Sequence, residues 1–380
     1  MFKKNVFLVF IVIAFGVIGC KQSQSDSVML PSAPNQIQYA EGFEWFDYDD
    51  FSLVRITQPW PGATNATTFV FAENKTSIPD SLRQFTFVKT PVNRVIVTST
   101  THLPSLVTLG ELSTLKAFPG LELVSSEEVR TLIEQGKIQE IGDGMGINFE
   151  LTIDATPDAV IANGGTDSFD KYQQIEHAGI PVIYNGDWVE QTPLGKAEWI
   201  KLFGVLYGKE NEAILFFDKV AEAYEKTKIS VRNIADKPIV FSGAMYEDVW
   251  YAPQGNSWTA QIIADAGGEY LWANRQGTGS LFLSFEQVLD DAQEAEFWIG
   301  PAQFTAYSQM ENANVHYKEF ESFQNKKVYT YSAKKGATGG VVFYEEATNR
   351  PDLLLKDYVK VLHPHLMPDH DLYFLSPLTE

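Results

Sequence analysis

The sequence predicts an α/β protein with two Rossmann-like lobes joined by one long helix, and a β-rich embellishment before the first lobe. Two observations carry this prediction. Short apolar segments that end in glycine, asparagine or serine alternate with helical segments in both halves of the chain, which is typical of parallel sheets with helical crossovers. A long helical pattern from Glu210 to about Val231 separates the two halves.

Length and composition exclude several classes of protein. The 380 residues have a globular composition, with 44% hydrophobic and 21% charged residues, and their number fits two domains. The formal net charge of −20 disfavours nucleic acid, because a polyanion is repelled and no basic patch is present. The single cysteine excludes a disulfide framework and a cysteine zinc cluster. We expect a monomer with no cofactor, no metal site and no nucleic-acid partner.

The first residues predict a lipoprotein signal peptide at 1–19. Lys3 and Lys4 precede an apolar run that is too short for a membrane span but suits a secretory signal. Val17-Ile-Gly-Cys20 resembles the bacterial lipobox, in which the cysteine is acylated and the preceding peptide is removed. We expect lipidation at Cys20, a polar tether at 20–39 and a body held at a membrane outside the cytoplasm, on the periplasmic side or the cell surface. The alternative is an ordinary signal peptide with an incidental cysteine.

The β-rich N-terminal element is expected at 40–92. Aromatic and β-branched segments, punctuated by proline and glycine, predict a small antiparallel sheet with strands at 43–48, 51–56 and 67–72. Lobe 1 follows at 93–192, with predicted strands at 94–97, 159–162 and 181–184 and a helix at 103–109.

Linking helices are expected at 193–234, because leucines and aromatics recur at helical spacing in 193–207 and again in 210–231. In the second of these helices, Ile214, Phe217, Val220, Ala221 and Tyr224 are expected to share one face. Lobe 2 takes 235–380, with predicted strands at 238–241, 297–299 and 327–331.

Two segments of the predicted lobes are alike. Asn148-Phe-Glu150 begins a short helix that leads to an apolar strand, and Ser284-Phe-Glu286 begins another that does the same. Asparagine and serine are good N-caps, and glutamate in the first turn interacts favourably with the helix dipole. The recurrence predicts two similar lobes.

Together with Arg94-Val-Ile-Val97, Ala178-Gly-Ile-Pro-Val182 and Ala266-Gly-Gly268, these segments resemble the substrate-binding lipoproteins of metal-chelate ABC importers. This class III periplasmic binding protein family captures iron siderophores, haem or cobalamin, and the resemblance covers about residues 91–360. It implies a chelate held between two lobes, and an ABC permease with its ATPase as partners. The glutamates that often dock the permease in this family fall at Pro104 and Asn256 here, and neither residue is acidic.

Ligands of open α/β sheets bind outside the carboxyl ends of strands, and pockets favour domain interfaces. Aromatic side chains in such loops bury the flat face of a chelate, and cations there pair with an anionic one. The expected ligand-binding residues are Thr100, Thr101, His102, Met145, Gly165, Trp188, Tyr246, Trp250, Trp258, Arg275, Lys335 and Thr338. The alternatives are core packing for the tryptophans, a solvated surface for Arg275, Lys334 and Lys335, and a hydrogen-bonded loop histidine for His102.

We expect a binding protein and not an enzyme. No Gly-x-Ser-x-Gly motif occurs, and the only cysteine is expected to be acylated. Carboxylates are frequent in so acidic a chain, so inspection leaves open a lipid-anchored glycoside hydrolase, and a non-transport surface scaffold lipoprotein is a third class. His363, His365 and His370 form a possible metal set near the C-terminus, which we interpret as incidental.

Overall fold

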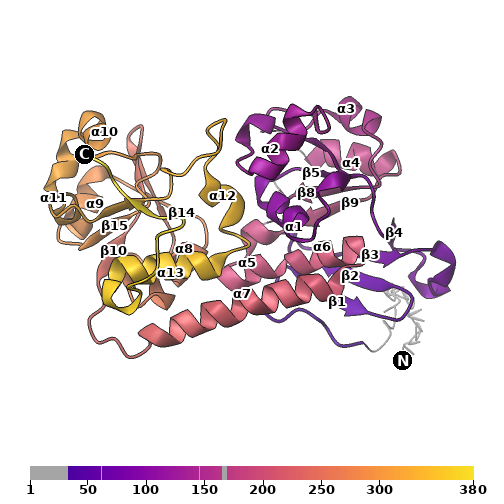
Figure 1. The fold of residues 1–380 in the computed structure, drawn as a ribbon, viewed down its shortest axis with the longest axis horizontal. Helices are drawn as coiled ribbons and strands as arrows, with labels where there is room; N and C mark the ends of the chain where they lie inside the picture. Colours follow the sequence, from indigo (N-terminus) through magenta and orange to yellow (C-terminus); the bar gives the residue numbers. More distant parts are fainter. Residues whose placement is uncertain (1–32, 61, 145, 165–168) are drawn as a thin grey trace, which may run out of the picture. The chain divides into compact units, whose positions relative to one another are not determined.

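The structure, a computed structural model, describes residues 33–60, 62–144, 146–164 and 169–380. The predicted signal peptide and three predicted site residues, Cys20, Met145 and Gly165, lie outside this part of the chain. Residues Ala33–Glu380 form one unit by their contacts. In chain order this unit contains an N-terminal sheet, a first lobe, linking helices and a second lobe (Figure 1). The predicted α/β class with parallel sheets is confirmed.

The N-terminal sheet has four strands in the order β1-β2-β3-β4, namely β1 (Phe43–Asp47), β2 (Ser52–Ile56), β3 (Thr67–Ala72) and β4 (Thr86–Lys89). The first three strands pair antiparallel, as predicted. The prediction of a purely antiparallel sheet is wrong for β4, which pairs parallel to β3. The physical reason is the connection, because two 3₁₀ turns between β3 and β4 carry the chain back across the sheet, as a parallel pair requires.

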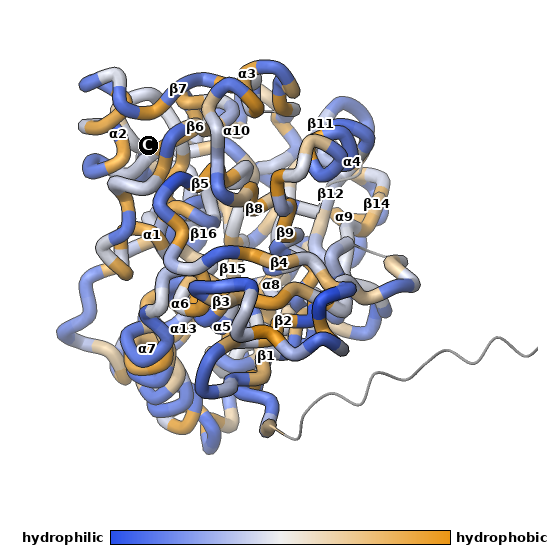
Figure 2. The backbone as a smooth tube through the Cα atoms, turned by 90° about the vertical axis from the view of Figure 1, so that its right-hand side faces the viewer, coloured by the Kyte–Doolittle hydropathy of each residue, from blue (hydrophilic) through white to orange (hydrophobic). Residues whose placement is uncertain are grey.

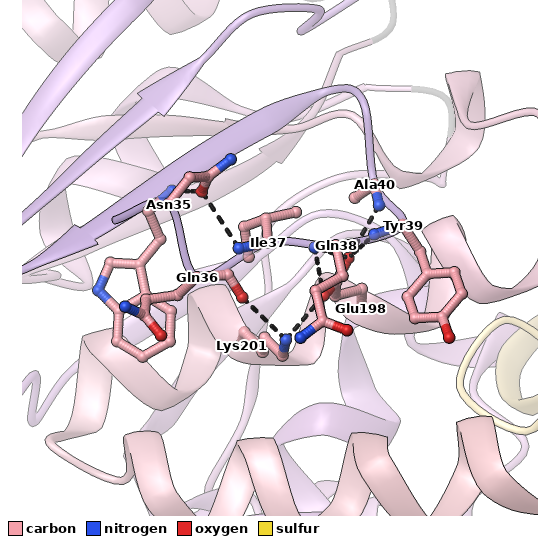
Figure 3. A network of polar contacts seen from close by, with 9 residues as sticks. Asn35, Gln36, Ile37, Gln38, Tyr39, Ala40, Glu198 and Lys201 are labelled. Carbon is pink, nitrogen blue, oxygen red and sulfur yellow. Dashed lines mark hydrogen bonds and ion pairs between the residues drawn. The ribbon is translucent and has the colours of Figure 1, made fainter. Parts of the chain in front are cut away.

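The segment before β1 is bound to the linking helices. The buried carboxylate of Glu198 accepts hydrogen bonds from the backbone N–H groups of residues 38–40 at 2.7 to 3.1 Å (Figure 3). Lys201 Nζ lies 2.7 Å from Glu198 Oε1 and donates to the carbonyl of Gln36. The Asn35 amide oxygen accepts from two further backbone groups. Residues 35–39, which were predicted to be part of the tether, are therefore bound to the body.

Lobe 1 contains a five-stranded parallel sheet in the order β7-β6-β5-β8-β9. The strands are β5 (Val95–Val97), β6 (Leu115–Phe118), β7 (Gln139–Glu140), β8 (Ala159–Asn163) and β9 (Val182–Asn185). The helices are α1 (Leu103–Thr108), α2 (Glu127–Glu134), α3 (Phe149–Asp154) and α4 (Phe169–His177). The predicted strands and helix are confirmed as β5, β8, β9 and α1, whereas β6 and β7 were not predicted.

Three helices link the lobes: α5 (Pro193–Glu198), α6 (Ile200–Tyr207) and α7 (Glu210–Val231). The bounds of α7 agree with the prediction, and Phe217, Val220, Ala221 and Tyr224 are buried on one face. Hydrophobic and hydrophilic residues are interspersed along α7 (Figure 2), and the buried ones recur every three or four positions. Helix α6 from the linker and α13 from lobe 2 both pack against it. The apolar stripe of α7 thus packs against a linking helix and against lobe 2.

Lobe 2 contains two sheets. The larger has the order β13-β10-β15-β16-β17 and consists of β10 (Ile239–Phe241), β13 (Glu269–Tyr270), β15 (Phe297–Ile299), β16 (Val328–Thr330) and the antiparallel edge strand β17 (Ser376–Pro377). The smaller is antiparallel and consists of β11 (Ala244–Tyr246), β12 (Val249–Pro253) and β14 (Ser280–Leu283). The helices are α8 (Trp258–Asp265), α9 (Phe285–Ala292), α10 (Tyr307–Ala313), α11 (Glu321–Gln324), α12 (Val342–Glu346) and α13 (Pro351–Leu362).

The predicted correspondence between the lobes is visible at two helix starts. Asn148 Oδ1 accepts from Leu151 N at the start of α3, and Ser284 Oγ accepts from Gln287 N at the start of α9. Each helix leads to a central strand, β8 in lobe 1 and β15 in lobe 2. Tyr246 and Trp250, which were predicted as ligand-binding loop residues, lie instead on the two strands of a hairpin, β11 and β12, and burial alternates along β12.

Candidate functional site

A cavity of about 840 Å³ lies at the carboxyl ends of three lobe 2 strands. Ser242 follows β10, Gly300 follows β15 and Tyr331 follows β16, and all three residues line the cavity. This is the edge at which parallel sheets bind ligands. The lining residues within the described chain all come from 242–358, which is lobe 2.

Aromatic rings form much of the cavity wall. Trp258 at the start of α8 stacks on Phe343 of α12, with ring centroids 5.9 Å apart and an interplanar angle of 23°. Phe343 in turn stacks on Tyr331 at 4.4 Å and 16°. Tyr246 and Tyr251 from the smaller sheet complete this wall. Rings fixed by such contacts can bury a flat ligand face at little entropic cost.

The hairpin β11–β12 decides which aromatic residues are available to a ligand. Tyr251 pairs with Phe282 across β12 and β14, and both rings are exposed. The neighbouring pair, Trp250 with Leu283, points to the other face and is buried. Trp250 is fully buried, and its Nε1 donates to the carbonyl of Ser242 at 3.0 Å. Trp250 therefore lies behind the cavity wall, and Tyr246, 68% exposed, lies on it.

The polar groups of the cavity are uncharged. No Asp, Glu, Lys, Arg or His occurs among the lining residues that the structure describes. Hydroxyl groups are supplied by Ser242, Ser257, Tyr331 and Tyr358 among others. Burial raises the pKa of Tyr331 well above its usual value and also raises the pKa of Tyr358, so both phenols stay protonated. The paired carboxyl groups that a glycoside hydrolase needs are not found among these residues.

The first-lobe candidates lie together in a separate place. Thr101 Oγ1 donates to Asp187 Oδ2 at 2.9 Å, and Trp188, 44% exposed, follows that aspartate. Thr100 and His102 belong to the same 3₁₀ turn as Thr101. His102 is fully buried, neither ring nitrogen has a hydrogen-bond partner among the described residues, and burial lowers its pKa. None of these residues is among those that line the cavity.

The candidate cations and Thr338 also lie off the cavity wall. Arg275 and Lys335 are exposed. Lys334 Nζ lies 3.6 Å from the centroid of the Tyr373 ring. Thr338 Oγ1 donates to the carbonyl of Val124 in lobe 1 at 3.4 Å. Of the described candidates, the fold therefore brings only Tyr246 and Trp258 together at the cavity.

A segment of lobe 2 docks on lobe 1. The Glu345 carboxylate of α12 accepts from the backbone N–H of Ser125 at 2.6 Å and of Ser126 at 3.1 Å, next to the start of α2. Asn349 Nδ2 donates to Ser105 Oγ at 3.0 Å. Glu345 is almost fully buried, and this burial raises its pKa. The two lobes are thus joined by a buried carboxylate in addition to the linking helices.

The raised pKa of Glu345 predicts a pH dependence of stability. Between about 4.5 and its raised value, the folded state binds more protons than the unfolded state, so stability is lost as pH rises through this window. We expect the Glu345→Gln variant to lack this component. The measurement is the free energy of urea unfolding at about pH 5 and about pH 7. The exposed Glu150→Gln is the control, and a wild-type pH profile in Glu345→Gln would contradict the assignment.

Sequence reasoning missed most of the lining residues, among them Ser242, Tyr251, Tyr331, Phe343 and Tyr358. Ser242 and Tyr331 had a usable signal, because each stands at the end of a predicted strand. Tyr251 lies on β12, a strand that was not predicted, and Phe343 and Tyr358 come from helices whose orientation no local pattern gives. Within the described chain, no group of three or more His, Cys, Asp or Glu side chains could hold a metal ion. His370 Nε2 lies 2.7 Å from Asp357 Oδ1, so its ring has a structural partner.

Comparison with known proteins shows which fold this chain shares. An uncharacterized lipoprotein of Methanocaldococcus jannaschii is 24% identical over 299 residues, which cover 76% of this chain and 70% of the relative. The molybdate-bound periplasmic binding protein of Haemophilus influenzae has a TM-score of 0.59 at 18% identity, over 75% of this chain and 90% of its own. The periplasmic haem-binding protein of Vibrio cholerae has a TM-score of 0.55 at 15% identity, over 69% and 99%. At such identities these two structures establish the fold alone.

The family of the chain is shown by the match of its sequence to a family model. Residues 95–334, well over half of the chain, match the family model of the periplasmic binding protein. The match begins at β5 and ends beyond β16, so it includes lobe 1 and most of lobe 2 and leaves the N-terminal sheet and helices α12 and α13 outside. Among the helices that the structure describes, none is both long and apolar enough to cross a bilayer. The chain belongs to the periplasmic binding protein family.

Proposed function

We propose that this protein is the lipid-anchored, extracytoplasmic substrate-binding component of an ABC importer, and that it captures a metal chelate. The observation that carries the proposal is the cavity of about 840 Å³ at the carboxyl ends of β10, β15 and β16. Its volume and aromatic wall suit a ligand of a few hundred daltons or more. Cys20, in the lipobox-like sequence, is the proposed site of acylation.

Two further observations support the proposal. The relative from Methanocaldococcus jannaschii is named a lipoprotein, in agreement with an anchor at Cys20. The similar solved structures carry the names of molybdate-binding and haem-binding proteins, so the fold accommodates both small anions and large chelates. An iron siderophore, haem or a cobalamin-type chelate would each fit the aromatic wall better than a small anion, because that wall offers no cation.

In the proposed mechanism the ligand is bound and released, and no covalent bond is formed or broken. A ligand on the lobe 2 wall would be enclosed by the lobe 1 loops that carry Thr101 and Trp188, and contacts to both lobes would select the ligand-bound arrangement. The Glu345 contact and the linking helices keep the lobes together during this step. The permease and its ATPase would then receive the ligand unaltered.

The test is mass spectrometry and absorption spectroscopy of the small molecules that co-purify with the protein, followed by isothermal titration calorimetry with each chelate found. A stoichiometric metal chelate is expected. Turnover of a glycoside, with no bound chelate, would instead support a lipid-anchored hydrolase. The absence of both would leave the scaffold class and would contradict the proposal.

Removing a wall aromatic is expected to weaken binding of that chelate. Trp258→Ala or Tyr246→Ala should lower its affinity by about 1–3 kcal/mol, because each ring is a buried contact in the complex. The measurement is calorimetric titration. Phe282→Ala is the matched control, since this ring is exposed on the same small sheet but is not part of the cavity lining. Equal affinities for all three variants would show that the ligand binds elsewhere.

A further inference from the structure

We propose that Glu345 is a positioning residue for the lobe 2 cavity. Lobe 1 holds its carboxylate, and this contact keeps the Phe343 ring of the same helix in the aromatic wall. This role rests on the proposed function in one respect, namely that this cavity binds the ligand. It means that a wall built from lobe 2 residues is set in place by lobe 1.

Helix α12 carries the wall and the anchor on opposite sides. Phe343 lines the cavity, whereas the Glu345 carboxylate accepts from the backbone N–H groups of Ser125 and Ser126 in lobe 1. Residues two positions apart on an α-helix point about 200° apart, so one side chain faces the cavity while the other faces lobe 1. Because α12 has only five residues, a displacement of Glu345 also moves Phe343.

The hairpin at 335–341, directly before α12, lies against the backbone of lobe 1. A Cβ atom on Gly336 would lie 2.5 Å from Ser125 Cα, and one on Gly340 would overlap the carbonyl oxygen of Leu123. Neither glycine has a φ in the left-handed region, so lobe 1 excludes a side chain there and the local backbone conformation does not. The hairpin and Glu345 therefore form one docking contact with lobe 1.

Phe343 is the central ring of the wall. It stacks on Trp258 on one side and on Tyr331 on another, and it lies edge-on to Phe374 with ring centroids 6.0 Å apart. These partners belong to other elements of lobe 2, so a shift of α12 disturbs each stack. The alternative is that ring contacts alone hold α12 in place, and that alternative predicts no effect of Glu345 on the wall.

The coupling acts in both directions. A ligand that packs on Phe343 and Tyr344 would favour the docked position of α12, and docking on lobe 1 would favour binding, because linked equilibria are reciprocal. The lobe contact and the cavity wall thus act as one unit, although different residues form them.

The test is ¹⁹F NMR of the full chain, freed of bound small molecules and labelled with 5-fluorotryptophan. Trp258→Phe assigns the Trp258 resonance, and Phe343→Ala gives its position without the stacked ring. In Glu345→Ala this resonance is expected to shift in the same direction as in Phe343→Ala, and the two lobe 1 amides should exchange at least about tenfold faster. Trp298, which is fully buried on β15, is the reference for the lobe 2 core and should not shift.

Two further variants of α12 separate positioning from loss of charge. Glu346→Ala removes the neighbouring carboxylate, which accepts from Tyr373 Oη at 2.7 Å within lobe 2, and should leave the Trp258 resonance in place. Glu345→Gln keeps one acceptor oxygen for lobe 1, so its shift should be smaller than that of Glu345→Ala. An equal shift in Glu346→Ala would overturn the inference.

The hairpin gives an independent test with the carboxylate intact. Gly340→Val should push the hairpin off lobe 1 and reproduce the Trp258 shift of Glu345→Ala, whereas Ala337→Val, at an exposed position of the same hairpin, should not. An unchanged Trp258 resonance in either Glu345→Ala or Gly340→Val would overturn the inference. Because these spectra are recorded without ligand, their outcome does not depend on the proposed function.

Discussion

Replacing Glu198 by alanine is expected to lower the free energy of unfolding by about 3–5 kcal/mol, because the change leaves a buried cation and the backbone N–H groups of residues 38–40 without their partner. Glu198 is fully buried, and its carboxylate holds both Lys201 Nζ and the backbone of residues 38–40 (Figure 3). Lys201 is 3% exposed, so water cannot replace the lost carboxylate. The segment before β1 should then detach from α5 and α6.

The measurement is urea unfolding of the wild type and the variant, with hydrogen exchange at residues 38–40 as a local readout. Glu44→Ala is the matched control, because Glu44 pairs with Arg55 at 3.3 Å on the surface and should contribute less than about 1 kcal/mol. Adding Lys201→Met to Glu198→Ala should recover part of the loss by removing the unpaired cation. Equal effects of Glu198→Ala and Glu44→Ala would contradict the account.

Local patterns were sufficient to predict the linking helix and the central strands. The apolar stripe of α7 recurs at helical spacing between Gly208 and the polar residues near Arg232, and its bounds follow from those signals. Strands β5 and β8 are buried on both faces, so they appear in the sequence as unbroken apolar runs. The N-caps Asn148 and Ser284 mark helix starts by a mechanism that acts within three residues.

Features that depend on distant partners were not predictable. Residues 35–39 have the composition of a tether, but the backbone of residues 38–40 is bound by a carboxylate 158 to 160 residues away in sequence. The parallel partner of β3 is chosen by a crossover and not by a periodic pattern. These are effects of tertiary structure on segments whose local signal is weak.

The candidate site also depends on tertiary contacts that local sequence patterns do not show. Tyr246 and Trp258, which line the cavity, were candidates because they stand near the ends of predicted elements, where ligands of open α/β sheets bind. Trp250 and Tyr251 are neighbours in sequence, and only the register of β12 against β14 sends the first into the core and the second to the surface. Ser242 is a single small residue after a strand, and its unpartnered hydroxyl is visible only when its surroundings are known.

Replacing Asp357 by alanine is expected to lower the free energy of unfolding by about 3–5 kcal/mol, because several buried donors lose their acceptor at once. The Asp357 carboxylate is fully buried on α13, where it accepts from the backbone N–H groups of residues 373–375 at 2.6 to 3.1 Å and contacts His370. These residues lead directly into β17, which pairs with β16. Urea unfolding measures the loss.

Two controls separate this role from simple loss of charge. Asp371→Ala removes an exposed aspartate nearby and should change stability by less than about 0.5 kcal/mol. His370→Ala removes one partner of Asp357 but keeps the backbone hydrogen bonds, so its effect should be less than half of that of Asp357→Ala; effects of equal size would contradict the account.

The Asp357→Ala change should also lower ligand affinity. Tyr331 follows β16 and Tyr358 follows Asp357, so weaker anchoring of β17 should shift two residues that line the cavity. The C-terminal segment thus links the stability of lobe 2 to the shape of its cavity.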